Sequence, residues 1–197
     1  MEIKKLICAV AVMQGITSCN GQAQKKTESM EGKKIIVAFY SMNGNTKAVA
    51  EYIKSKTGAD IYEIKTSEVY SKDWNETVEI VGKQGKTYEP ALIGDMPNVR
   101  KYDVVFIGTP CWWGTIANPV RSFLHEVDLS DKTIAPFMTH GTSGRKLQEM
   151  KKLCPNSTVL EGIGIYNRYQ VETKVNSVEN LGDYKPEVDK WLKSIGF

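Results

Sequence analysis

Three short stretches of this sequence place small, polar and aromatic residues directly after an apolar run, where a buried strand would end. They cover residues 41–46 (SMNGNT), 109–114 (TPCWWG) and 139–144 (THGTSG). Hydroxyls, amides and backbone N–H groups can bind an anion, and indole rings can stack on a flat aromatic group. These stretches are therefore the first candidates for a ligand site.

The first stretch has the composition of an anion site. Ser41, Asn43, Asn45 and Thr46 surround Gly44, immediately before a predicted helix. Backbone N–H groups at a helix N-terminus, together with the helix dipole, favour an anion such as phosphate. An Asn-Gly pair alone is typical of a turn, but a turn does not need four side-chain donors in six residues. The stretch matches neither the P-loop nor the three-glycine dinucleotide pattern, so it predicts a phosphate monoester bound mainly by neutral donors.

The second stretch contains two adjacent tryptophans. Successive side chains in extended backbone face opposite ways, so Trp112 and Trp113 cannot both enter the same core. One can be a core residue, and the other needs a partner such as a flat aromatic ligand. A protein interface or a packed corner is the alternative. The third stretch, residues 139–144, could place N–H groups against a polar ring edge, although such a run is also typical of a turn before a helix.

Apolar runs alternate with helical patterns from Lys34 onward, as expected for an α/β domain. The first run, IIVAFY, is continuous, which is typical of a parallel strand covered on both faces. Pro136 interrupts the fourth run and is expected to mark a bulge. The predicted strands are residues 35–40, 61–64, 104–108, 133–139 and 158–165.

Helical patterns separate these runs. Gly58 is a suitable stop for the helix after the first strand. Asn118 and Pro119 predict a helix that starts with a cap and a proline in its first turn, and Pro186 lies in the first turn of the last helix. The connection 65–100 is longer than a crossover requires and contains a further helical pattern.

Five strands alternating with helices predict a three-layer, doubly wound α/β sandwich with a five-stranded parallel sheet. In such a sheet, ligands bind beyond the carboxyl ends of the strands. The three candidate stretches follow the first, third and fourth strands, so we expect them to lie at the same edge.

The composition excludes several other classes. The chain has 197 residues, enough for one domain, and a formal charge of +3 with Lys and Arg scattered along its length. No basic stripe with interleaved aromatics is present, so a nucleic-acid partner is not expected. Four cysteines in no pairable framework and two isolated histidines predict no metal site.

The N-terminus reads as a processing segment. Residues 1–18 contain two lysines, a short apolar stretch and small residues before Cys19, which is the anatomy of a secretory signal. Residues 16–19 (ITSC) resemble a bacterial lipobox, with Ile16 where Leu is usual, so Cys19 is expected to be lipid-modified. Residues 19–33 are then a flexible tether, with a reach of about 20 Å, and the folded domain spans 34–197. Translation from Met30 is the alternative.

The loops together resemble those of a known family. The stretch VAFYSMNGNT is similar to the flavodoxin signature that binds the phosphate of FMN. The stretches TPCWWGTIANPV and PFMTHGTSG are similar to the two loops that hold the isoalloxazine ring in a bacterial flavodoxin-like family. The resemblance covers nearly all of residues 34–197 and implies FMN as cofactor and the strand order 2-1-3-4-5.

The resemblance also implies the residues that contact FMN. Asn43 replaces a more usual Thr or Ser, and the second ring loop lacks a Tyr, so the tryptophan pair is expected to do most of the stacking. His140, if protonated near flavin N1, would stabilise the reduced ring, or it is simply a turn residue. Cys111 is expected to be a small packed hydrophobe rather than a redox thiol. The expected FMN-binding residues are Ser41, Met42, Asn43, Gly44, Asn45, Thr46, Thr109, Pro110, Cys111, Trp112, Trp113, Gly114, Thr139, His140, Gly141 and Gly144.

Two functions follow from this resemblance. In the first, the protein is an electron carrier that docks with redox partner proteins and has no catalytic residue or substrate of its own. In the second, it is an FMN-dependent NAD(P)H:quinone-type reductase, although no nicotinamide-binding motif is present. Flavodoxin carriers are usually strongly acidic, whereas this chain is mildly basic, and charge governs partner choice rather than fold. A non-redox, lipid-anchored binding module is a third reading, which the intact loops oppose.

The signal sets the expected location. A lipid anchor at Cys19 would hold the protein in the bacterial cell envelope, facing the periplasm. A start at Met30 would instead place it in the cytoplasm.

Overall fold

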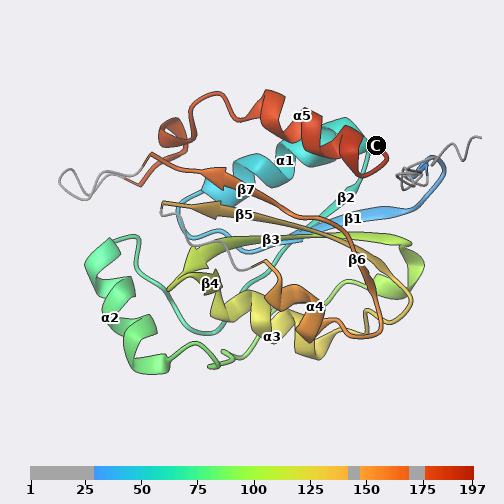
Figure 1. Ribbon diagram of the computed structural model, residues 1–197. Helices are drawn as coiled ribbons and strands as arrows, with labels where there is room; N and C mark the ends of the chain where they lie inside the picture. The colour runs from blue at the N-terminus through green and yellow to red at the C-terminus, as the bar shows by residue number, and fades with distance from the viewer. Residues whose placement is uncertain (1–28, 142–146, 169–175) are drawn as a thin grey trace, which may run out of the picture.

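The computed structural model describes residues 29–141, 147–168 and 176–197 (Figure 1). The predicted signal, Cys19 and the tether as far as residue 28 lie outside the described residues. Within the described part of the chain, no helix is long and apolar enough to cross a membrane.

The fold is built on a parallel sheet, and its main path runs β2-β1-β3-β5-β6. β7 pairs with β5 beyond β6, and short β4 returns antiparallel along the end of β3. With β4 set aside and β6 and β7 counted as one strand position, this is the predicted order 2-1-3-4-5, which is confirmed. The strands are β1 (Ile35–Phe39), β2 (Asp60–Glu63), β3 (Val104–Trp112), β4 (Thr115–Ile116), β5 (Thr133–His140), β6 (Thr158–Val159) and β7 (Ile163–Tyr166).

Helices cover both faces of the sheet, which confirms the predicted three layers. In Figure 1, α1 and α5 lie on one face, and α3 and α4 lie on the other. α2 belongs to the long connection between β2 and β3. The helical elements are α1 (Asn45–Thr57), α2 (Trp74–Gln84), α3 (Asn118–Glu126), α4 (Glu149–Leu153), α5 (Lys185–Ser194) and the short 3₁₀ turns η1 (Val99–Lys101) and η2 (Val178–Leu181).

The strand β1 shows why its sequence is apolar throughout. Val37 and Phe39 pack in the core beneath α1 and α5, whereas Ile36 and Ala38 pack in the core on the α3 side. Successive residues of a strand face opposite ways, so a strand covered on both sides needs apolar residues at every position. β1 ends next to the first candidate stretch and thereby fixes its position.

Pro136 does not mark a bulge, and this prediction is wrong. β5 pairs one-to-one with β3 through this position, with Pro136 opposite Ile107. On its other side β5 pairs with β6 as far as Ile134 and with β7 from Phe137, so Pro136 lies opposite the gap between them. The missing proline N–H therefore leaves no ladder bond unmade.

Two further boundaries differ from the sequence interpretation. The run 158–165 forms β6 and β7 rather than one strand, because the chain between Leu160 and Gly162 leaves the ladder. Asn118 is the first residue of α3 rather than its cap, and its Nδ2 donates to the backbone oxygen of Gly85 over 3.2 Å. That bond ties α3 to the end of α2.

The packed domain begins before Lys34. Met30, expected to be part of the tether, is only 9% exposed and packs among the residues beneath α1 and α5. Its backbone N–H donates to the oxygen of Gly196 over 3.2 Å. The described end of the predicted tether is thus held against the C-terminus, because its one large apolar side chain finds a place in the core.

Candidate functional site

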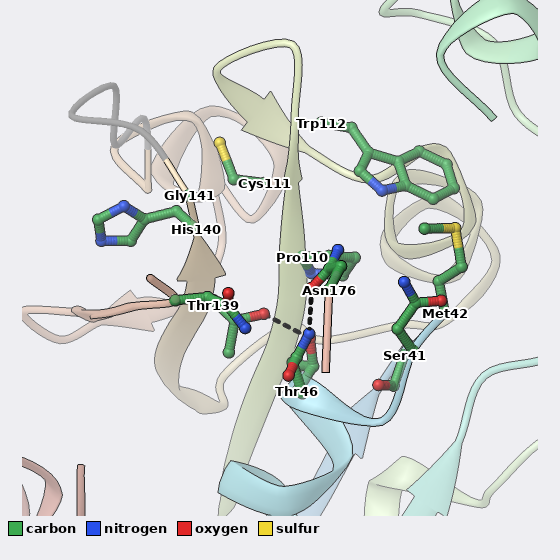
Figure 2. A pocket seen from close by; sticks show the side chains of 13 residues that line it. Ser41, Met42, Thr46, Pro110, Cys111, Trp112, Thr139, His140, Gly141 and Asn176 are labelled. Carbon is green, nitrogen blue, oxygen red and sulfur yellow. Dashed lines mark hydrogen bonds between the residues drawn. The ribbon is translucent and has the colours of Figure 1, made fainter. Parts of the chain in front are cut away.

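A pocket at the carboxyl ends of β1, β3, β5 and β7 brings the candidate stretches together. Figure 2 shows Ser41, Met42 and Trp112 on one side of it and His140 on the other. This is the edge at which an open parallel sheet binds ligands. The residues that line the pocket are Ser41, Met42, Asn43, Asn45, Thr46, Pro110, Cys111, Trp112, Thr139, His140, Gly141, Asn167 and Asn176.

The turn between β1 and α1 presents polar groups to this pocket. The side chain of Thr46 is fully buried, and its hydroxyl shares a hydrogen bond of 2.8 Å with the hydroxyl of Thr139. The Ser41 hydroxyl and the Asn43 Oδ1 atom are buried and have no hydrogen-bond partner among the described residues. Buried polar atoms are nearly always paired, so these two indicate a bound group with polar atoms of its own.

Gly44 does not line the pocket but shapes the turn. Its φ of 84° lies in the left-handed region that favours glycine, and it immediately precedes the first residue of α1. A Cβ at this position would lie 3.3 Å from Cγ2 of Val178. Gly44, expected from the sequence to contact FMN, is therefore needed for the turn between β1 and α1. This turn brings the N-terminus of α1 to the pocket.

The two tryptophans diverge. Trp112 is 6% exposed, lines the pocket, and packs edge-on against Tyr40 and Tyr70, with ring centroids 5.6 and 4.8 Å away. Trp113 has a φ of 51°, is 55% exposed and does not line the pocket. Of the expected pair, only Trp112 is placed to touch a ligand ring.

Thr109 and Gly114 hold the shape of this loop rather than line the pocket. The Thr109 hydroxyl accepts the Ala117 N–H over 2.9 Å and donates to the oxygen of Pro110 over 2.9 Å. Gly114, with a φ of 79°, forms the turn between β3 and β4. The second ring loop contributes Thr139, His140 and Gly141, while Gly144 lies outside the described residues.

Two lining residues are absent from the sequence prediction. Asn167 follows β7; its N–H donates to His140 over 2.8 Å, its Nδ2 donates to Ser177 over 3.2 Å, and its buried Oδ1 has no partner among the described residues. Asn176 accepts from Asn45 Nδ2 over 2.6 Å. Asn167 comes two residues after the last predicted strand, 158–165, so the rule that ligands bind beyond the carboxyl ends of strands could have found it. Asn176 comes from irregular chain that no pattern marks.

The described part of the pocket lining is poor in charged side chains. No Lys, Arg, Asp or Glu occurs among the lining residues that the structure describes. Burial raises the pKa of the Cys111 thiol, with the Gly114 N–H acting in the opposite sense, so this side chain is a neutral thiol at physiological pH. No group of three metal-ligating side chains occurs in the ranges that the structure describes. Neutral donors and an indole suit a ligand that combines an anion with a flat ring.

Comparisons with known proteins agree with this geometry. A solved flavoprotein of Bacteroides eggerthii is 28% identical, with a TM-score of 0.65, over 84% of this chain and 99% of that one. A flavoprotein of Lactobacillus acidophilus, solved in complex with FMN, is 25% identical, with a TM-score of 0.59, over 81% of this chain and 98% of its own. A flavoprotein of Bacteroides uniformis, 23% identical with a TM-score of 0.67 over 83% of this chain and 99% of that one, shares the fold.

The family model described as Flavodoxin matches residues 34–181, from the residue before β1 to the end of η2. The match includes every described residue that lines the pocket. The chain belongs to the flavodoxin family.

Proposed function

We propose that this protein binds FMN in the pocket and carries electrons between redox partners. The observation that carries the proposal is one pocket in which a neutral anion-binding turn lies beside Trp112. Family membership and the FMN complex of the Lactobacillus acidophilus flavoprotein support FMN as the cofactor. FMN, when bound, supplies the redox chemistry because it can take up and release one or two electrons.

The residues present fit FMN at both of its ends. The Ser41 hydroxyl and the first N–H groups of α1 can donate to the phosphate, because donors at a helix N-terminus suit a doubly charged anion, whereas the buried Asn43 Oδ1 can only accept a hydrogen bond. The buried Asn167 Oδ1 can accept only from a group that carries a hydrogen, which phosphate at neutral pH lacks and the ribityl hydroxyls and ring N–H of FMN provide. A ligand with both kinds of group is what this set of atoms requires.

The neutral lining bears on the redox potential. Reduction adds negative charge to the ring, and among the described residues no Lys or Arg side chain lines the pocket to compensate it. Bound FMN should therefore have a lower potential than free FMN. A low potential suits a donor of electrons to partner proteins.

The test is to titrate the purified protein with FMN and follow tryptophan fluorescence and the visible spectrum. We expect FMN to quench the tryptophan fluorescence with a dissociation constant in the micromolar range or below. The FMN-loaded protein should then oxidise NADH and NADPH no faster than free FMN does. Rapid oxidation of NAD(P)H with a quinone as acceptor would show that the protein is a reductase and not an electron carrier. Absence of flavin binding would remove both functions.

We also propose that the protein is anchored in the bacterial cell envelope through a lipid at Cys19, where membrane-bound redox proteins are its partners. The support is the sequence of residues 1–19. Labelling cells with a radioactive fatty acid should mark the protein and should fail for Cys19→Ser. Recovery of an unlabelled protein that starts at Met30 from the cytosol would contradict the proposal.

A further inference from the structure

The pocket wall that carries Trp112 is one half of a small hairpin. β4 runs back along the end of β3, with Cys111 opposite Ile116 and Trp112 opposite Thr115. Cys111 and Trp112 line the pocket, and their ladder partners Ile116 and Thr115 are buried beside them. The position of Thr115 therefore sets the position of the Trp112 backbone.

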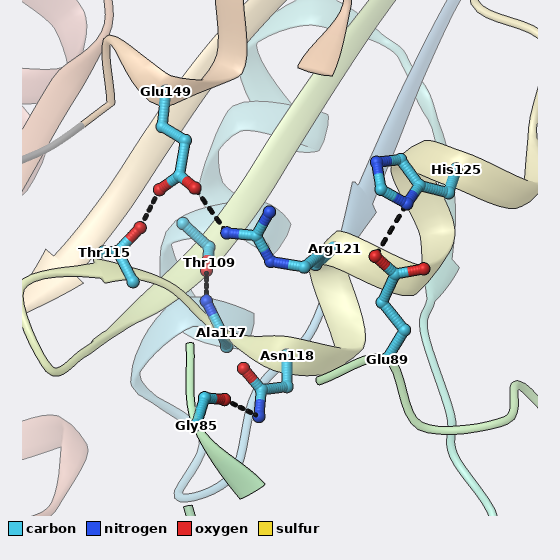
Figure 3. A network of polar contacts seen from close by, with 9 residues as sticks. All are labelled: Gly85, Glu89, Thr109, Thr115, Ala117, Asn118, Arg121, His125 and Glu149. Carbon is cyan, nitrogen blue, oxygen red and sulfur yellow. Dashed lines mark hydrogen bonds and ion pairs between the residues drawn. The ribbon is translucent and has the colours of Figure 1, made fainter. Parts of the chain in front are cut away.

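Thr115 is tied to two helices by an ion pair in which the arginine is buried and the glutamate is half-buried. Its hydroxyl donates to one carboxylate oxygen of Glu149, at the start of α4, and the other carboxylate oxygen pairs with Nη2 of Arg121 in α3 (Figure 3). The Thr109 hydroxyl holds the other end of the same loop through the Ala117 N–H. The hairpin is thus fixed at both ends.

The burial of this pair calls for an explanation. The Arg121 side chain is 7% exposed and that of Glu149 is 28% exposed, and Arg121 Nε has no partner among the described residues. A buried ion pair seldom stabilises a fold more than apolar residues of the same size would, because both charges lose their hydration. Its use is more often to fix one arrangement of the groups around it.

The same helix offers a contrast. His125, one turn beyond Arg121, pairs with Glu89 over 2.7 Å, and both of these side chains are more than a third exposed. That pair does not contact the hairpin. It serves as an internal control for a charged contact of α3 that lies away from the pocket.

We propose that Arg121 and Glu149 are positioning residues for flavin binding: through Thr115 they hold the hairpin so that Cys111 and Trp112 meet the ring. Neither side chain lines the pocket. The inference rests on the proposed binding of FMN. The hairpin would hold the ring rather than the phosphate. Removing the contacts among Arg121, Glu149 and Thr115 should therefore raise the dissociation constants of riboflavin and FMN by the same factor.

The test uses a double variant that removes the tie without leaving a buried charge. Arg121→Met combined with Glu149→Leu fills the site with apolar groups, so its melting temperature should stay near that of the wild type. Its dissociation constants for FMN and for riboflavin should both rise about tenfold, since a site held loosely loses affinity without losing contacts. The ligand-free variant should also show a changed near-ultraviolet circular dichroism, because Trp112 packs 4.8 Å from Tyr70.

Glu89→Gln is the matched control and should leave both affinities and the dichroism unchanged. A double variant that melts like the wild type and binds both flavins with wild-type affinity would overturn the inference while the proposed function stands. A loss of affinity for FMN alone would also overturn the inference, because such a result would mean that the substitutions act on the phosphate and not on the ring. If the wild-type protein binds no flavin, the proposed function and this inference fall together.

Discussion

At the scale of single residues, the pocket is defined by buried atoms that lack a partner. Ser41 and Asn43 show this most directly, since the protein buries their side-chain oxygens and gives them no hydrogen bond within the described residues. Leaving such atoms unpaired costs free energy, which a ligand with matching groups would recover.

Ser41→Ala should therefore weaken the binding of FMN more than the binding of riboflavin. We expect roughly a tenfold rise in the FMN dissociation constant, the usual effect of one hydrogen bond to a charged group, with little change for riboflavin, which lacks the phosphate. Fluorescence titration of both flavins measures the effect. Ser55→Ala removes a hydroxyl from the exposed face of α1 and should change neither value; equal losses for the two flavins in Ser41→Ala would contradict the assignment.

Tyr70, which packs against Trp112, should make the fold sensitive to alkali. Burial raises its pKa from 10.0 to about 12. Between these values the unfolded chain releases the phenolic proton while the folded chain keeps it, so the free energy of unfolding should fall as pH rises from about 10 to about 12. Urea unfolding across this range measures the slope.

Tyr70→Phe is the comparison for this slope. It removes the hydrogen bond to Gln84 Oε1 and should cost about 1 kcal/mol at pH 8. It should also lose less stability than the wild type between pH 10 and 12. Parallel curves for the two proteins would show that Tyr70 does not titrate in that window.

The sequence identified the polar residues of the pocket better than the aromatic ones. Hydroxyls and amides packed into SMNGNT have few other uses, so their type and spacing were informative. Adjacent tryptophans were ambiguous, because the direction of each ring depends on the turn that Gly114 makes and on the space beside Tyr40 and Tyr70. Asn176 could not be predicted, because its contact with Asn45 joins segments 131 positions apart.

At the scale of elements, the close approach of strands and side chains decides where glycine is needed. In β3, a Cβ on Gly108 would lie 2.3 Å from the ring of Phe137 and 2.8 Å from Cβ of Phe39. In α2, a Cβ on Gly82 would meet only Trp113, at an ordinary 3.7 Å. The same substitution should therefore have opposite effects in the two elements.

Gly108→Ala should destabilise the protein by about 1–3 kcal/mol, because the core beside β3 has no room for another methyl group. Gly82→Ala should stabilise it by about 0.5–1 kcal/mol through helix propensity. Chemical denaturation of the two variants beside the wild type measures both effects. A Gly108→Ala protein as stable as the wild type would mean that Phe137 moves aside at little cost.

The type and order of the elements followed from periodicity, while their irregularities did not. A continuous apolar run predicted β1 because both of its faces are covered. The prediction of a bulge at Pro136 failed because the position where its N–H would be lies opposite the gap between β6 and β7, and this gap is a feature of the folded sheet. The sequence around Pro136 does not contain the information that the adjacent strand is interrupted at this point.

At the scale of the whole molecule, the two described ends of the chain meet. Met30 packs beneath α1 and α5 and bonds to Gly196, so residues just before β1 support the last helix. No periodicity marked Met30 as a core residue, because a single apolar side chain in a polar stretch has no pattern.

Met30→Ala should lower the free energy of unfolding by about 2 kcal/mol, the value for removing a largely buried methionine. Val69→Ala, at a side chain that is 88% exposed, is the control and should change stability little. Guanidinium unfolding measures both. An unchanged midpoint for Met30→Ala would restore the view that residues 29–33 are only tether.

The parallel sheet also separates the pocket from the end of the chain that leads to Cys19. Residues 30–34 enter β1 at the amino ends of the parallel strands, and the pocket lies at their carboxyl ends, where its first lining residue, Ser41, is about 20 Å of extended chain beyond Ile35 (Figure 1). Electron tunnelling through protein decays exponentially with distance, so a donor seated where the chain enters the domain would exchange electrons very slowly with a ring in the pocket. In the proposed carrier, electrons would therefore enter and leave through the mouth of the pocket, and a domain fixed rigidly to an electrode at residue 30 should exchange electrons with it only through a soluble mediator.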